Sequence, residues 1–176
     1  MKANSERIPN KNLKLFNGKP LYHIVMNTLI SSELISLVVV NTDSKKIKED
    51  IEINFPEKVL VIDRPNKIQG NSISMNKIIA FDIKKIPADI YLQTHSTNPL
   101  LSKETIDLSI YKMLECLKGK EYDSIFSVSK IQTRLYDHNT NPINHDHKNL
   151  IMTQKLEPIF EENSNLYLFT RKSFSE

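Results

Sequence analysis

Short apolar runs rich in β-branched residues alternate with stretches of helical periodicity, and this alternation restricts the fold more than any other feature of the sequence. The run 34–40 (LISLVVV), for example, is closed by Asn41-Thr42-Asp43. Strands are predicted at residues 34–40, 59–62, 90–93, 124–128 and 166–169. Helices are predicted between them at residues 20–30, 44–53, 74–84 and 103–117. This order indicates an α/β fold with a mostly parallel sheet flanked by helices.

Residues at the ends of the predicted helices support these boundaries. Asp43 or Ser44 is placed to cap the helix 44–53, and Ser102 to cap the helix 103–117. Pro20 suits the first turn of its helix, where a missing N–H loses no hydrogen bond. Ligands of open α/β sheets bind beyond the carboxyl ends of the strands. We therefore expect functional residues at 41–44, 63–65 and 93–99, and before the first helix.

Composition narrows the class of protein. The 176 residues, 39% of them hydrophobic and 26% charged, suit a single globular domain. A net charge of +3 is small, and the basic residues cluster in one short loop without an interleaved aromatic stacking platform, which argues against a nucleic-acid partner. No apolar run approaches the roughly 20 residues of a membrane span, and the N-terminus lacks the apolar core of a signal peptide. With Cys116 as its single cysteine, the chain is expected in the cytoplasm, without a membrane partner.

The stretch 132–149 (QTRLYDHNTNPINHDHKN) differs from the rest of the chain because it is polar and rich in turn-forming residues. It is predicted to be an extended arm or loop, and a candidate contact surface. Its three histidines, His138, His145 and His147, lack the spacing that places metal ligands on one face of a helix or strand. We therefore predict no metal site there.

The first nineteen residues carry five cations against one acid, Glu6, with polar turn residues between them. Exposed N–H groups combined with cations can hold a triphosphate and offset the charge that grows on a leaving pyrophosphate. The alternative is a solvated basic N-terminus, and composition alone does not separate the two. The cations are Lys2, Arg7, Lys11, Lys14 and Lys19.

Motif spacing favours the first interpretation. Residues 5–12 (SERIPNKN) followed by 15–21 (LFNGKPL) resemble the signature loop of sugar-activating nucleotidyltransferases, and Lys11-Asn12 resembles the acylneuraminate cytidylyltransferases among them. Those enzymes make CMP-activated sialic acids and related nonulosonic acids. Further motifs of that family follow in order at 39–43 (VVNTD), 64–65 (RP), 93–100 (QTHSTNPL), and at Gln154 with 162–167 (ENSNLY). The resemblance implies a Rossmann-like fold of the nucleotide-diphospho-sugar transferase type.

The resemblance also implies roles for individual residues. Lys11 would stabilise the α-phosphate during attack. Lys2 would hold the triphosphate at a position where the family usually has arginine, and a lysine cannot form the bidentate hydrogen bonds of a guanidinium. The loop contacts to the nucleotide would come from Ala3, Asn4, Ser5, Arg7 and Asn12. Residues near the cytosine and ribose would be Asn41, Thr42, Asp43 and Arg64. Those lining the sugar acid would be Gln93, Thr97, Asn98, Gln154 and Asn163.

Plainer interpretations of two of these residues remain open. Asp43 could simply cap the helix that follows it, and Arg64 before Pro65 could belong to a surface turn.

The implied reaction is attack of the anomeric hydroxyl of a 2-keto sugar acid on the α-phosphorus of CTP, which releases pyrophosphate. Such transfer normally uses a divalent cation, and Mg²⁺ is the cofactor expected from the family. The family commonly forms homodimers in which an arm reaches towards the partner's sugar site, so the arm 132–149 is the expected contact.

Two departures from the family pattern bear on activity. The loop begins at Lys2 without a preceding apolar strand, and no late aspartate pair follows to hold the metal. We therefore expect this single domain to bind metal–CTP poorly or to turn over slowly. Two alternatives stay open: a related nucleotidyltransferase for another keto-deoxy sugar acid, and a catalytically impaired remnant that only binds nucleotide.

Overall fold

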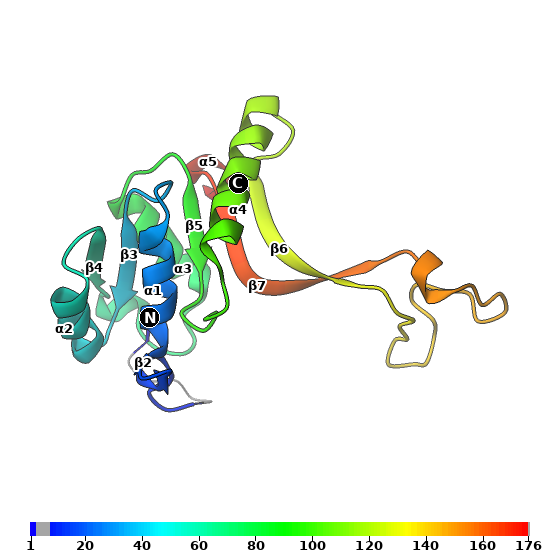
Figure 1. Cartoon of the computed structure of the whole chain (residues 1–176), viewed down its shortest axis with the longest axis horizontal. Helices are drawn as coiled ribbons and strands as arrows, with labels where there is room; N and C mark the ends of the chain where they lie inside the picture. The colour runs from blue at the N-terminus through cyan, green and yellow to red at the C-terminus, as the bar shows by residue number, and fades with distance from the viewer. Residues whose placement is uncertain (3–7, 176) are drawn as a thin grey trace. The chain divides into compact units, whose positions relative to one another are not determined.

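The structure, a computed structural model, describes residues 1–2 and 8–175 (Figure 1). Four predicted loop residues, Ala3, Asn4, Ser5 and Arg7, lie outside the described residues. The chain divides into two compact units, a larger one of Met1–Ile125 with Leu166–Glu176 and a smaller one of Phe126–Asn165.

The predicted helices are confirmed to within two residues at either end. They are α1 (Leu21–Ser31), α2 (Lys45–Asn54), α3 (Met75–Lys85) and α4 (Lys103–Gly119), followed by the short α5 (Arg171–Ser175). The strands are β1 (Leu15–Phe16), β2 (Lys19–Pro20), β3 (Val38–Thr42), β4 (Val59–Asp63), β5 (Tyr91–Thr94), β6 (Ser124–Ile131) and β7 (Ile159–Phe169). Short 3₁₀ turns are η1 (Lys11–Leu13), η2 (Asn66–Ile68) and η3 (Thr153–Lys155). The α/β fold class is confirmed.

Strand β3 pairs in parallel with β4, from Val38 opposite Val59 to Thr42 opposite Asp63. Four of its five residues are buried, because both α1 and α2 pack against it. Val38 and Val40, on one face of the strand, share a core with α1 and α2, whereas Val39, on the opposite face, is half-buried. The core here joins the two helices to the strand and consists of Tyr22, Met26, Val38, Val40, Ile47, Ile51 and Phe55.

The second sheet has the order β5-β7-β6, and β5 pairs with β7 antiparallel. Helix α4 packs against this sheet. Its Ile106 and Met113 form a core with Leu166 and Leu168 of β7. The mostly parallel sheet that we predicted is therefore represented by the β3–β4 pair, while the β5–β7 pair is antiparallel.

Several sequence-based boundaries differ from the structure, among them the end of the strand expected at residue 128, which lies at Ile131. The strand expected from residue 34 begins at Val38, because the N–H of Leu34 bonds the Ser32 hydroxyl in a turn and its side chain is exposed. The strand expected from residue 166 begins at Ile159. Its first part is mostly exposed to solvent, so the polar residues before Leu166 can belong to the strand. Pro20 lies just before α1 rather than in its first turn.

The helix caps resolve one alternative. Ser44 caps α2 by accepting a hydrogen bond from the Ile47 N–H at 3.3 Å, so Asp43 is not the cap. Ser102 caps α4 as predicted, accepting from the Thr105 N–H at 3.2 Å.

The turn that leads into α1 is a tight hairpin between β1 and β2. Its two central residues, Asn17 and Gly18, have φ of 49° and 77°. An Asn-Gly pair favours this turn because both positions require the left-handed region. The hairpin fixes where the basic loop ends and α1 begins.

The smaller unit is built on the outer parts of β6 and β7 and on the irregular segment between them. Asn163 joins the two strands, accepting from the Ser127 hydroxyl at 2.6 Å and donating to the Ser129 hydroxyl at 3.2 Å. Between the strands, the bridges Tyr136–Pro142 and Asp146–Asn149 are isolated. The predicted arm 132–149 is thus irregular backbone within this unit.

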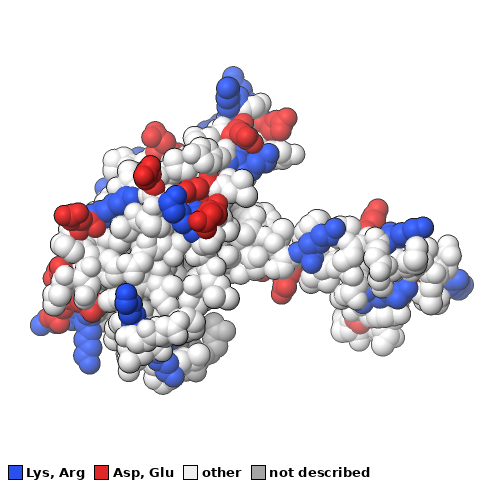
Figure 2. All heavy atoms as spheres, viewed as in Figure 1, with Lys and Arg blue, Asp and Glu red and all other residues white. Residues whose placement is uncertain are grey.

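No helix among the described residues is long and apolar enough to span a membrane. On the face of the larger unit that Figure 2 shows, basic and acidic side chains are intermixed.

Candidate nucleotidyl-transfer site

A buried polar cluster lies at the carboxyl ends of β3 and β4, where an open α/β sheet binds its ligands. Asn41 and Arg64 are each 6% exposed. The Asn41 amide donates to the Asp82 carboxylate at 2.6 Å, and its Oδ1 accepts from Arg64 Nε at 2.7 Å. Arg64 Nη2 also donates to the Asn41 carbonyl at 2.9 Å. Asn41 thus connects the buried guanidinium of Arg64 to the half-buried carboxylate of Asp82.

The electrostatics of this cluster follow from its burial. Burial lowers the pKa of the Arg64 guanidinium, against the opposing effect of Asp43 and Asp82. Burial likewise raises the pKa of Asp82, although its hydrogen bond from Asn41 and the charge of Arg64 act in the opposite direction. Arg64 therefore belongs to the interior, and the surface-turn interpretation is wrong.

A hollow of about 520 Å³ opens beside the cluster. Three predicted nucleotide residues, Thr42, Asp43 and Arg64, line it together with the α2 cap Ser44. Its walls carry charges of both signs, and Lys48 Nζ lies 2.6 Å from an oxygen of Asp63. Charged and polar groups at a strand end suit a polar ligand such as a nucleoside.

The end of the basic loop meets the segment after β5. Asn12, buried, accepts a hydrogen bond from the Ser96 hydroxyl at 2.8 Å and donates to the Lys2 carbonyl at 3.3 Å. Lys2 itself reaches the Asn71 side chain at 3.2 Å. Lys11 precedes Asn12 at the start of η1 and is half-buried. Asn12 thus joins two segments separated by 84 residues in the sequence.

The residues expected near the sugar acid fall into both units. Gln93 is in β5 opposite Tyr167, and Thr97 and Asn98 are in the turn that follows. These three are half-buried and lie on one continuous segment of the larger unit. Gln154, in η3, and Asn163, in β7, belong to the smaller unit.

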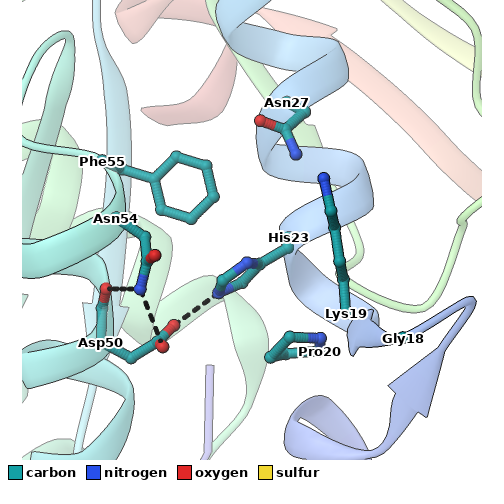
Figure 3. Close-up of a pocket in the computed structure, with 8 residues that line it drawn as sticks. All are labelled: Gly18, Lys19, Pro20, His23, Asn27, Asp50, Asn54 and Phe55. Carbon is teal, nitrogen blue, oxygen red and sulfur yellow. Dashed lines mark hydrogen bonds and ion pairs between the residues drawn. The ribbon is translucent and has the colours of Figure 1, made fainter.

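A second hollow, of about 400 Å³, adjoins the Gly18-Lys19-Pro20 turn (Figure 3). His23 Nε2 lies 2.5 Å from Asp50 Oδ2, and Asp50 also accepts from the Tyr22 hydroxyl and from Asn54 at 3.1 Å. Burial alone would raise the pKa of Asp50, but these hydrogen bonds together lower it. The cluster ties α1, which follows the basic loop, to α2.

Two groups close to the loop were missed by sequence reasoning. The His23–Asp50 pair left no signal, because its members come from different helices. His95 sits between predicted residues, and its position directly after a strand end could have identified it. Burial and the charge of Lys11 lower the pKa of its imidazole below the ordinary value.

The expected Mg²⁺ would need a group of side-chain ligands if the protein itself held it. No three His, Cys, Asp or Glu side chains gather within residues 1–2 and 8–175 as a metal site requires. The carboxylates whose charge acts on Arg64 are Asp43 and Asp82, and Asp82 already accepts from Asn41. The described residues thus do not fit a protein-held ion.

Comparison with known proteins agrees with this architecture. The chain is 30% identical over 131 residues to 3-deoxy-manno-octulosonate cytidylyltransferase 2 of Hydrogenovibrio crunogenus, covering 74% of this chain and 50% of that protein. It is 26% identical to the CMP-N,N'-diacetyllegionaminic acid synthase of Legionella pneumophila subsp. pneumophila, covering 99% of this chain and 77% of that protein. The chain thus spans about half of the first relative and about three quarters of the second.

Among solved structures, a CMP:2-keto-3-deoxy-manno-octonic acid synthetase complexed with CTP has the same fold. It superposes with a TM-score of 0.72 at 14% identity, over 99% of this chain and 73% of that one. The pattern that defines the Cytidylyltransferase family matches residues 1–175. This chain belongs to the cytidylyltransferase family.

Proposed function

We propose that the chain transfers CMP from CTP to a 2-keto sugar acid and releases pyrophosphate. One contact carries the proposal: the 2.8 Å hydrogen bond between Asn12 and Ser96. It joins the loop proposed to hold the triphosphate to the segment proposed to hold the sugar acid. Such a junction is what in-line attack on the α-phosphorus needs, because both substrates must be held within reach of each other.

The roles within this reaction follow from charge and position. Lys11, beside Asn12, offsets the charge that develops on the transferred phosphoryl group. Thr42, Asp43 and Arg64 surround the nucleoside at the hollow beside β3 and β4, with Asn41 holding Arg64 in place. Gln93, Thr97 and Asn98 line the acid. Mg²⁺ remains the proposed cofactor, with its ligands drawn mainly from the phosphates of CTP, as is usual for this ion.

Two classes of acceptor compete. A nonulosonic, sialic-acid-like acid is favoured by the loop motif and by the similarity to the legionaminic acid enzyme, which spans nearly the whole chain. A smaller keto-deoxy octulosonic acid is favoured by the similarity to the Hydrogenovibrio enzyme.

The test is incubation of the chain with CTP, Mg²⁺ and a panel of both acid classes, with mass spectrometry of the products. A CMP-sugar acid and pyrophosphate in equal amounts are expected, and the acid consumed fastest identifies the acceptor class. Release of CMP without a sugar conjugate would contradict the proposal.

We also propose that a second copy of the chain contacts the smaller unit. Exposed and half-buried residues alternate along strand β6. The apolar Phe126 and Val128 are exposed, whereas Ser127 and Ser129 are half-buried. Leu150 and Met152, just after the arm, are 63% and 60% exposed. A face of this kind is stabilised when another apolar surface covers it.

A further inference from the structure

His95 lies at the junction of the two proposed half-sites. It directly follows Thr94, the last residue of β5, and stands between Gln93 and Thr97, which are proposed to line the sugar acid. Its carbonyl accepts from the Asn98 N–H at 3.1 Å, which closes a turn. The next residue, Ser96, is bonded to Asn12 of the basic loop at 2.8 Å. Strand, turn and loop contact together fix the backbone that carries the imidazole.

The surroundings of this imidazole suit a proton acceptor. His95 is half-buried, and its ring makes no hydrogen bond to any of residues 1–2 and 8–175. The charged group that acts on it within those residues is Lys11. Because burial and this cation both lower its pKa below 6.5, the imidazole is neutral at pH 7 and carries a lone pair.

We propose that His95 is the general base of the transfer, an inference that rests on the proposed cytidylyl transfer. A ring nitrogen takes the proton of the anomeric hydroxyl while that oxygen forms its bond to the α-phosphorus of CTP. The bond from the α-phosphorus to the bridging oxygen breaks, and pyrophosphate leaves with the electron pair. The imidazolium then returns its proton to solvent.

His95 stands in the chain between the proposed acid-lining residues Gln93 and Thr97, and its imidazole is near enough to Lys11 for that charge to lower its pKa, as this role requires. Lys11 stabilises the phosphoryl group that is attacked, so the attacking hydroxyl must arrive beside it from the side of Gln93 and Thr97. An imidazole at that boundary is placed to meet the hydroxyl. Its neighbour Lys11 also opposes stable protonation of the ring, which keeps the base available.

The test compares the wild type with His95→Gln and His95→Ala over about pH 5 to 8. General-base catalysis contributes on the order of 10²- to 10⁴-fold. We therefore expect kcat to fall by about 10²-fold or more in both variants, with the KM for CTP unchanged. In the wild type, log kcat should rise with pH up to a midpoint below 6.5 and then level off. That acid limb should be absent in both variants.

Two readouts separate a base from a structural histidine. Added imidazole should restore part of the kcat of His95→Ala and leave His95→Gln unaffected, because only the alanine variant leaves space for it. Melting temperatures of the variants should remain close to that of the wild type.

Retention of kcat and of the acid limb in His95→Gln, with the wild type active, would overturn the role of His95 and leave the proposed function intact. Loss of activity without rescue and with a raised KM for CTP would also overturn it, in favour of a binding or structural role. A wild type that forms no CMP-sugar acid with any member of the panel would overturn both proposals.

Discussion

Replacing Asn41 by alanine tests whether the polar cluster behind the nucleotide hollow acts as a structural unit. The side chain donates to Asp82 and accepts from Arg64, at 2.6 and 2.7 Å. Alanine removes both bonds and leaves the buried Arg64 and the half-buried Asp82 without the amide that connects them. The change should therefore lower the stability of the fold.

The magnitude follows from the number and kind of the lost bonds. Hydrogen bonds to charged groups contribute about 1.5–3 kcal/mol each. Arg64 keeps its 2.9 Å bond to the Asn41 carbonyl, so the lower end of the range applies to each lost bond. We expect a loss of about 3 kcal/mol in the free energy of unfolding. For a chain of this size that corresponds to a fall of roughly 6–12 °C in Tm.

Urea unfolding followed by circular dichroism measures the free energy, and differential scanning calorimetry measures Tm. Asn76→Ala is the matched control, because Asn76 is exposed on α3 and should change the free energy of unfolding by less than about 0.5 kcal/mol. A change for Asn41→Ala no larger than that of the control would refute the structural role of the cluster. Asn41 would then be better explained as a direct ligand contact.

Two further predictions concern regions outside this cluster. Hydrogen bonds hold the pKa of Asp50 in the folded state below its ordinary value of 3.8. The stability that the ionised carboxylate contributes is therefore present above pH 3.8 and is lost as the pH falls through the folded-state pKa. The difference in unfolding free energy between wild type and Asp50→Asn should thus shrink below pH 3.8, and a difference that grows would contradict the assignment. Replacing Leu150 and Met152 by aspartate should convert a dimer to a monomer in light scattering after size exclusion, and an unchanged mass would argue against this interface.

Most of the fold could be predicted from the sequence because local signals and packing agree. Val38 and Val40 of β3 are buried in the core with α1 and α2, and the serines at 44 and 102 cap helices by the expected bonds. The boundaries that failed depend on features that the hydrophobic pattern does not report. The turn at Leu34 follows from a single serine hydroxyl, and the long exposed part of β7 pairs polar residues that carry no strand pattern.

The candidate site was predictable in part. Motif spacing suggested Asn41 and Arg64, but only the structure shows that they bond each other and that Asn41 also bonds Asp82. Asp82 gave no signal, because it lies in α3 and joins the cluster through a partner 41 residues away. His95 lies within the predicted range 93–99 but was given no role, because the effect of Lys11 on its pKa comes from a residue distant in sequence.

The central claim is that the loop ending at Lys11 and Asn12 transfers the cytidylyl group. Its most direct test is formation of labelled CMP-sugar acid from α-labelled CTP by the wild type, Lys11→Ala and Lys14→Ala. Lys14 is the matched control, since it is exposed and lies three residues further along the same basic segment. Product from the wild type and from Lys14→Ala, with none above background from a folded Lys11→Ala, is the expected result. Equal product from all three proteins, or equal transfer from labelled ATP and GTP, would contradict the claim.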